Sequence, residues 1–187
     1  PVNEVSLRID EQVLSNTLSV PCSGKKLFSF PAQSNVSGVK HDLKWVEYAQ
    51  KKGWNVMLDA AAFVPSNPLS LREIQPDFVS VSFYKIFGFP TGIGCLLVHK
   101  DSFDLLQKRW FAGGNVSFVS VKRASHFFQS DHERFENGTI NYLEIPAIKT
   151  GLEFIESIGL DRIQDRVASL SQNLCYSIDK ITHTNGV

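Results

Sequence analysis

The sequence predicts an α/β fold in which a mostly parallel sheet is flanked by helices. Two observations predict it. In the first half of the chain, short apolar runs of strand length alternate with segments of helical periodicity, a pattern typical of parallel sheets. The chain is also 187 residues long, with 43% hydrophobic and 20% charged residues, which is the composition of a globular protein with one substantial core.

The first expected elements are a strand, a helix and a second strand. An apolar run over residues 26–30 is stopped by Pro31. Apolar residues at helical spacing follow over 43–49, and this pattern gives way at Gly53 to a strand over 54–59. This part of the chain is therefore predicted to be strand, helix, strand.

Two more strands are expected further along the chain. Residues 77–82 are rich in the residue types that suit a buried strand. The segment 88–92 contains glycine and proline and breaks the chain, and another strand is expected over 93–98. These strands complete the predicted sheet.

The second half of the chain is expected to be mainly helical. A helical pattern begins at Asp101 and continues through Gln107. Apolar residues recur at helical spacing over 143–157 and over 161–181, two segments separated by a glycine. Asp161 is predicted to cap the last helix.

The chain is expected to be one domain that binds neither nucleic acid nor a membrane. No linker or repeat divides it, so residues 1–187 are treated as a single partial domain. The formal net charge is zero, which gives no general attraction to nucleic acid or to an anionic membrane. No apolar run reaches bilayer-spanning length and no signal-type segment opens the chain, so we expect a cytoplasmic protein.

The cysteines and histidines indicate neither a disulfide framework nor a metal site. The three cysteines are widely spaced without a C-x-x-C pair, so reduced thiols are expected. Cys95 falls in an apolar strand and Cys175 in a helix, and both are expected to be core thiols. The five histidines, His183 among them, show no ligand spacing.

Asp59 and Lys85 are the first candidates for chemistry. Asp59 closes one predicted strand and Lys85 lies just past another, and ligands of open α/β sheets bind beyond the carboxyl ends of the strands. Strands lie about 4.8 Å apart, so an acid and an amine at such ends can share one cleft. That pairing suits pyridoxal 5′-phosphate, whose aldehyde condenses with an amine while a carboxylate keeps its ring nitrogen protonated. A simpler interpretation stays open, in which Asp59 forms a turn and Lys85 is solvated.

Three local strings resemble a known family. They are LDAAAF at 58–63, SVSFYKIFGFPTGIG at 80–94 and RFENGT at 134–139. They look like the class V aminotransferase and cysteine desulfurase superfamily, and within it they are most similar to the molybdenum cofactor sulfurase branch. The resemblance covers residues 27–180 in the order that the family requires. It implies part of the large domain of a fold-type I pyridoxal-phosphate-dependent transferase.

The resemblance also implies roles for individual residues. Lys85 would hold pyridoxal 5′-phosphate as a Schiff base, and Asp59 would pair with the pyridinium nitrogen. Ser82 would bind the cofactor phosphate. Asn35 would hydrogen-bond the phenolic oxygen of the ring or the substrate carboxylate. Thr139 would reach the phosphate of the neighbouring subunit, which requires a homodimer.

Each of these assignments has a structural alternative. Ser82 can be a small inward-facing residue of a buried strand, Asn35 and Asn137 can be turn formers, and Thr139 can cap a helix. Asn115 lies in a Gly-rich loop where the resembling branch usually has threonine, so the resemblance supports it least.

The activity implied by the resemblance is pyridoxal-phosphate-dependent sulfur transfer from L-cysteine to the molybdenum cofactor. A cysteine desulfurase or a selenocysteine lyase is the alternative within the same fold. A non-catalytic fragment that acts only as a dimerising or interaction module is the alternative from another class. The upstream cofactor-binding segment and the downstream sulfur-accepting cysteine loop of the family are expected outside residues 1–187, so this piece alone is expected to be inactive.

Overall fold

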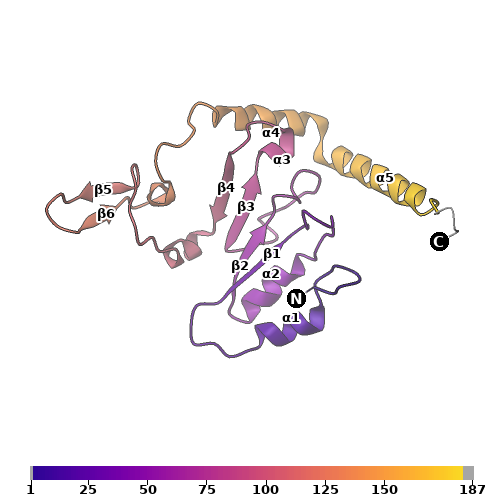
Figure 1. The fold of residues 1–187 in the computed structure, drawn as a ribbon, viewed down its shortest axis with the longest axis horizontal. Coiled ribbons are helices and arrows are strands. Elements are labelled where there is room, and N and C mark those ends of the chain that lie inside the picture. Colours follow the sequence, from indigo (N-terminus) through magenta and orange to yellow (C-terminus); the bar gives the residue numbers. More distant parts are fainter. Residues whose placement is uncertain (1, 183–187) are drawn as a thin grey trace.

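The centre of the molecule is a four-stranded sheet. A computed structural model of the chain describes residues 2–182, so His183 lies outside the described residues. The strands follow in the order β1 (Leu27–Pro31), β2 (Asn55–Asp59), β3 (Phe78–Ser82) and β4 (Gly94–Val98). The pairs β1–β2 and β2–β3 are parallel and β3–β4 is antiparallel, which confirms the predicted mostly parallel sheet (Figure 1).

The carboxyl ends of the parallel strands are in register. Pro31 pairs with Asp59, and Asp59 pairs with Ser80. The parallel hydrogen bonding continues one residue beyond the end of β1 and one residue beyond the end of β2. The Ala32 amide donates to the Asp59 carbonyl at 2.8 Å, and the Ala60 amide donates to the Ser80 carbonyl at 3.0 Å. The loops that follow β1 and β2 therefore start at one edge of the sheet.

Two helices pack with β1 and β2 to form the core. Helix α1 (Glu11–Leu18) was not among the predicted elements; it begins after Asp10, whose carboxylate accepts from the Val13 amide at 2.9 Å as an N-cap. Helix α2 (Lys44–Lys51) is the predicted one, and its Tyr48 hydroxyl lies 2.6 Å from the Ser15 hydroxyl of α1. The buried core cluster comprises Leu14, Leu18, Phe30, Ala32, Trp45, Val46, Ala49, Val56, Leu58, Ala60 and Val79.

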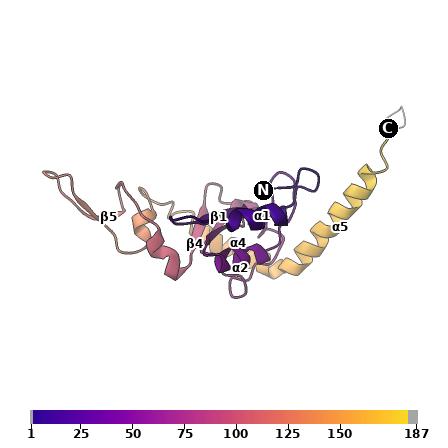
Figure 2. The same ribbon diagram turned by 90° about the horizontal axis from the view of Figure 1, so that it is seen from below.

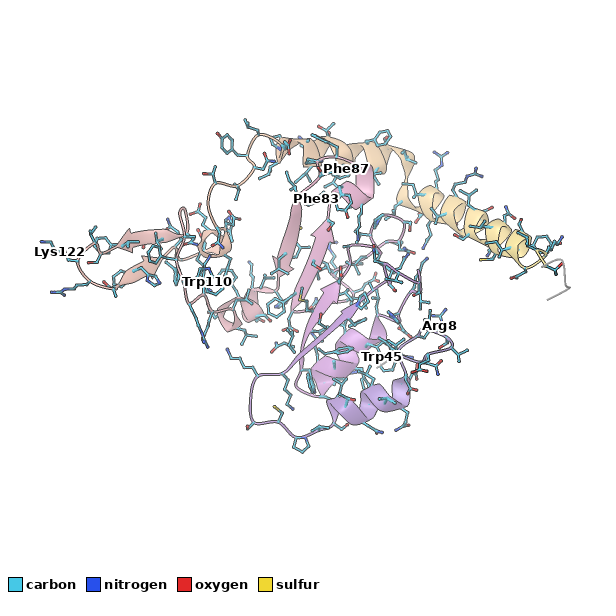
Figure 3. All side chains as sticks on the ribbon, in the orientation of Figure 1. Arg8, Trp45, Phe83, Phe87, Trp110 and Lys122 are labelled. Atoms are coloured by element: carbon cyan, nitrogen blue, oxygen red, sulfur yellow. The ribbon has the colours of Figure 1, made fainter. Side chains whose placement is uncertain are left out.

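A short helix follows β3 directly and packs against a longer one. Helix α3 (Tyr84–Phe87) ends at Gly88, which has a φ of 84° that favours glycine. Helix α4 (Pro146–Ile158) contacts it, and Phe83 and Phe87 of the α3 segment lie beside α4 in Figure 3. Pro146 occupies the first turn of α4, where a missing amide hydrogen costs nothing.

The second half differs from the prediction between residues 106 and 145. It contains an antiparallel ribbon of β5 (Val116–Val119) and β6 (His126–Phe128) between two 3-10 segments, η1 (Lys100–Leu105) and η2 (His132–Phe135). The expectation of a mainly helical second half was therefore wrong here, because the ribbon residues are β-branched and aromatic and pair across the hairpin. The ribbon and α5 (Leu160–Ile178) extend from opposite ends of the molecule (Figures 1 and 2).

Two details of α5 also differ from the prediction. The N-cap position is occupied by Gly159 and not by Asp161, because the helix begins at Leu160 and places Asp161 within its first turn. Cys175 is exposed on α5 and is not a core thiol, whereas Cys95 on β4 is partly buried and burial raises the pKa of its thiol. Among residues 2–182, no helix is long and apolar enough to cross a membrane.

Candidate functional site

Lys85 and Asn35 meet at the carboxyl edge of the parallel strands. Lys85 lies in α3, the turn of helix that follows β3, and Asn35 lies in the loop that follows β1. The Lys85 Nζ donates to the Asn35 Oδ1 at 2.8 Å, although the two residues are 50 positions apart in the sequence. The structure therefore places an amine and an amide, both predicted as site residues, in direct contact.

Asp59 closes β2 at the same edge. Its Oδ1 accepts from the Ala61 amide at 3.0 Å and from the Ser80 hydroxyl at 3.3 Å. The residue is exposed, and among residues 2–182 no protein donor contacts its second carboxylate oxygen. Local contacts thus orient the carboxylate through one of its two oxygens.

Ser82 is the last residue of β3 and precedes the Lys85 helix by two positions. It pairs with Gly94 of β4, and a Cβ at Gly94 would lie 2.6 Å from the Val81 carbonyl oxygen. Glycine at this position lets β4 approach the end of β3 closely. Ser82 itself is partly buried.

Thr139 lies in a different part of the molecule from the other predicted residues. It lines a cleft of about 390 Å³ together with Gly113, Gly114, Glu133, Glu136, Gly138 and Ile140. None of Lys85, Asp59, Ser82 and Asn35 lines this cleft. Helix α4 begins at Pro146 with Ile145 as its N-cap, so the alternative of Thr139 as a helix cap is wrong.

Asn115, the residue that the resemblance supports least, is buried in the structure. Its side chain is fully buried and its Nδ2 donates to the Asn137 Oδ1 at 2.9 Å. The Lys108 Nζ contacts the same oxygen. Neither Lys108 nor the pairing of the two asparagines was predicted, because the contacts join residues 22 and 29 positions apart.

A second carboxylate, Asp77, lies at the opposite edge of the sheet, just before β3. It is 8% exposed and accepts hydrogen bonds from Val56 at 2.8 Å and Asn55 at 2.7 Å, both in β2, and from Ser102 at 2.6 Å and Gln50 at 3.2 Å. Burial acts to raise the pKa of Asp77, but these hydrogen bonds to the charged form outweigh it and hold the pKa below its usual value.

Comparisons with known proteins show the family of the chain. The family model for aminotransferase class-V matches residues 6–186. Molybdenum cofactor sulfurases of Caenorhabditis elegans and Homo sapiens are 44% and 38% identical over 99% and 100% of this chain, which covers only 26% and 22% of their length. The chain thus spans about a quarter of these curated relatives.

Solved structures confirm the predicted fold class. An apo cysteine desulfurase of Thermococcus onnurineus NA1 matches with a TM-score of 0.81 and 27% identity, over 92% of this chain and 42% of that one. The cysteine desulfurase CsdA of Escherichia coli matches with a TM-score of 0.82 over 97% of this chain and 44% of that one, and at 23% identity it supports the fold alone.

Proposed function

Because this chain belongs to the aminotransferase class-V family, we propose that its parent protein is a pyridoxal-5′-phosphate-dependent sulfurtransferase that takes sulfur from L-cysteine and sulfurates the molybdenum cofactor. One observation carries the proposal: the Lys85 amine lies 2.8 Å from the Asn35 amide at the edge of the sheet where Asp59 ends its strand. The sulfur acceptor is inferred from the relatives, because the proteins named molybdenum cofactor sulfurase align with nearly the whole chain.

The residues at this edge fit pyridoxal 5′-phosphate. The cofactor needs an amine for its aldehyde, an anion for its ring nitrogen and donors for its phosphate. Lys85 would provide the amine, the exposed carboxylate of Asp59 would face the ring nitrogen, and the Ser82 hydroxyl would donate to the phosphate. When bound, the cofactor supplies an electron-accepting ring that stabilises carbanion charge on an amino acid.

The side chains would then divide the remaining work. Asp59 would hold a proton on the ring nitrogen, and the Ala61 amide and the Ser80 hydroxyl keep its carboxylate oriented for that purpose. Asn35 would hold the Lys85 amine in place whenever that amine is not bonded to the cofactor, because the two already form a hydrogen bond. Lys85 would also move protons to and from the substrate carbon as a general acid and base.

Borohydride reduction of the full-length parent protein tests the assignment of Lys85. We expect visible absorbance from the bound cofactor, and a peptide map of the reduced protein should find the pyridoxyl group on Lys85. Lys85→Ala should abolish the covalent link and reduce turnover by at least about 10³-fold, since the nucleophile is lost. The matched control is Lys100→Ala at the other edge of the sheet. Pyridoxyl on another lysine would overturn the assignment.

A cysteine desulfurase with a different sulfur acceptor is the second candidate, favoured by the fold match to the Thermococcus onnurineus enzyme. Both candidates release alanine from L-cysteine, so that assay does not separate them. Sulfuration of a molybdenum hydroxylase does, because only the first candidate passes sulfur to the molybdenum cofactor. Alanine release without that sulfuration would leave the desulfurase as the function.

We propose further that the parent protein is a cytoplasmic homodimer. Two observations support the dimer. Thr139 lines a cleft that none of Lys85, Asp59, Ser82 and Asn35 lines, as expected of a residue that serves the neighbouring subunit. The apolar side chains of Trp110, Phe118 and Phe127, on or beside the ribbon, are largely exposed and could be covered by a second subunit. Trp110 lies with the ribbon away from the sheet in Figure 3. Sedimentation of the full-length protein tests the dimer, and a monomer that retains activity would contradict it.

A further inference from the structure

Asn67 is a buried polar residue that joins three segments near the carboxyl edge of the parallel strands. It is 2% exposed and lies in the loop between β2 and β3. Its Nδ2 donates to the Phe63 carbonyl at 2.9 Å, to the Ser66 hydroxyl at 3.2 Å and to the Gln33 Oε1 at 3.2 Å. Its Oδ1 accepts from the Gln164 Nε2 of α5 at 3.3 Å. The buried amide is thus hydrogen-bonded at both ends, as its burial requires.

The Phe63 contact fixes which way the Asn67 amide points. A carbonyl oxygen only accepts, so the group that faces it is the NH2 group of Asn67. The same NH2 group reaches Gln33, which presents its side-chain oxygen. The Phe63 amide donates to the Ala60 carbonyl at 3.0 Å, in the turn that directly follows Asp59. The direction of the Asn67 donor is therefore set within the loop that follows Asp59.

Gln33 carries this contact into the loop that holds Asn35. It lies directly before a segment that closes on itself, because the Ser34 amide donates to the Val39 carbonyl at 2.9 Å. Asn35 is exposed in this segment, and its Oδ1 accepts from the Lys85 Nζ at 2.8 Å. The position of Asn35 thus depends on how the segment is held, and Gln33 ties it to a buried residue.

We propose that Gln33 and Asn67 are positioning residues that hold Asn35 beside the Lys85 amine, so that this amine is in place to react with the cofactor aldehyde. The inference rests on the proposed function, which supplies the aldehyde. In that step the Lys85 nitrogen forms a double bond to the aldehyde carbon, and the aldehyde oxygen leaves as water with two hydrogens of the amine. An amine held in one orientation reacts faster than a freely rotating one, so the rate of attachment reports the effect.

The test follows the visible absorbance that appears when saturating pyridoxal 5′-phosphate is added back to the full-length parent protein after removal of its cofactor. Gln33→Leu and Gln164→Leu form a matched pair, because both side chains are partly buried and each change breaks one side-chain contact of Asn67. Only the first contact leads to Asn35. Gln33→Glu keeps an acceptor for the Asn67 NH2 group. Urea unfolding of each variant establishes that it is folded.

We expect Gln33→Leu to slow the attachment about fivefold, which is the size of one neutral hydrogen bond. Gln33→Glu should restore the rate to within about twofold of the unsubstituted protein, because the acceptor is kept. Gln164→Leu should also stay within about twofold, because the Phe63 carbonyl still orients Asn67.

A double-mutant cycle separates positioning from a general loss of structure. In an Asn35→Ala background, Gln33→Leu should cause no further slowing, because the residue through which it acts is gone. Further slowing there, equal slowing in the two leucine variants, no slowing in Gln33→Leu, or no recovery in Gln33→Glu would overturn this inference alone. Absence of a Lys85-dependent band in the unsubstituted protein would instead overturn the proposed function, and this inference with it.

Discussion

Asp77 and Asp59 are carboxylates at opposite edges of the same sheet, and their surroundings differ. Asp77 is 8% exposed and accepts hydrogen bonds from four residues. Asp59 is exposed and accepts from two, both through one oxygen. At the amino edge of the parallel strands, the Asp77 carboxylate is bound by protein donors. At the carboxyl edge, both hydrogen bonds to Asp59 end on one of its two oxygens.

The difference has a physical consequence for each edge. A buried carboxylate is tolerated only when hydrogen bonds replace its lost hydration, so Asp77 and its donors depend on one another. An exposed carboxylate keeps its hydration and adds little to stability, so Asp59 can be placed for binding without cost to the fold. Replacing each residue should therefore separate stability from function.

The largest effect is expected from Asp77→Ala. It leaves the donors of Gln50, Asn55, Val56 and Ser102 without their acceptor, and the free energy of unfolding should fall by about 3 kcal/mol or more. Urea unfolding of the protein measures the loss. The folded fraction of Asp77→Ala should keep its affinity for the cofactor, so any loss of cofactor binding should match the loss of folded protein.

Asp59→Ala is the matched control for that experiment. It should change the free energy of unfolding by less than about 1 kcal/mol, because one of its two hydrogen bonds is exposed and the other is only partly buried. It should nevertheless reduce turnover severely. A stability loss in Asp59→Ala equal to that in Asp77→Ala would show that both edges are structural, and the comparison would fail.

The sheet could be predicted from the sequence because its signals are local. Each of the four strands is an apolar run bounded by a breaker, such as the glycine and proline of 88–92. Helix α1 was missed although Asp10, Glu11 and the i, i+4 pair of Leu14 and Leu18 form a recognisable start and apolar face. The ribbon was missed because its short strands carry a bulge near Phe118 that interrupts their register.

The site could be predicted only in part. Lys85 and Asp59 follow from their places at strand ends, which are local facts. Asp77 was predicted only as the first residue of the strand over 77–82, because its donors come from residues 21 to 27 positions away. Contacts of this kind between distant segments leave no local pattern, and the partners of Asn115 escaped prediction for the same reason.

Gly151→Ala should disturb the carboxyl edge and spare the amino edge. A Cβ at Gly151 of α4 would lie 2.4 Å from the Phe87 ring of α3, so the ring or the helix must move. We expect an overpacking cost of about 1–3 kcal/mol, offset in part by the roughly 1 kcal/mol higher helix propensity of alanine. Because α3 carries Lys85, cofactor affinity should fall several-fold.

Absorbance titration with pyridoxal 5′-phosphate measures the effect of Gly151→Ala, and Thr150→Ala, an exposed change in the same helix, is the control. The hydrogen bonds of Asp77 should be unaffected, so the effect of Asp77→Ala on unfolding should be the same in the Gly151→Ala background. Unchanged cofactor affinity in Gly151→Ala would show that α3 does not depend on α4 for its position.

The smallest effect is expected from acid, because protonation weakens Asp77 as an acceptor without removing it. The pKa of Asp77 lies below its usual 3.8 in the folded protein. Its charge therefore stabilises the fold fully above the unfolded pKa, and this contribution is lost as the pH falls through the lower folded pKa. Asp77→Asn cannot titrate, so the stability gap between it and the unsubstituted protein should be constant from pH 7 to pH 5 and should shrink below about pH 3.8. Urea unfolding at each pH measures the gap. A gap that widens in acid would mean that the folded pKa is raised, and that the hydrogen bonds do not outweigh burial.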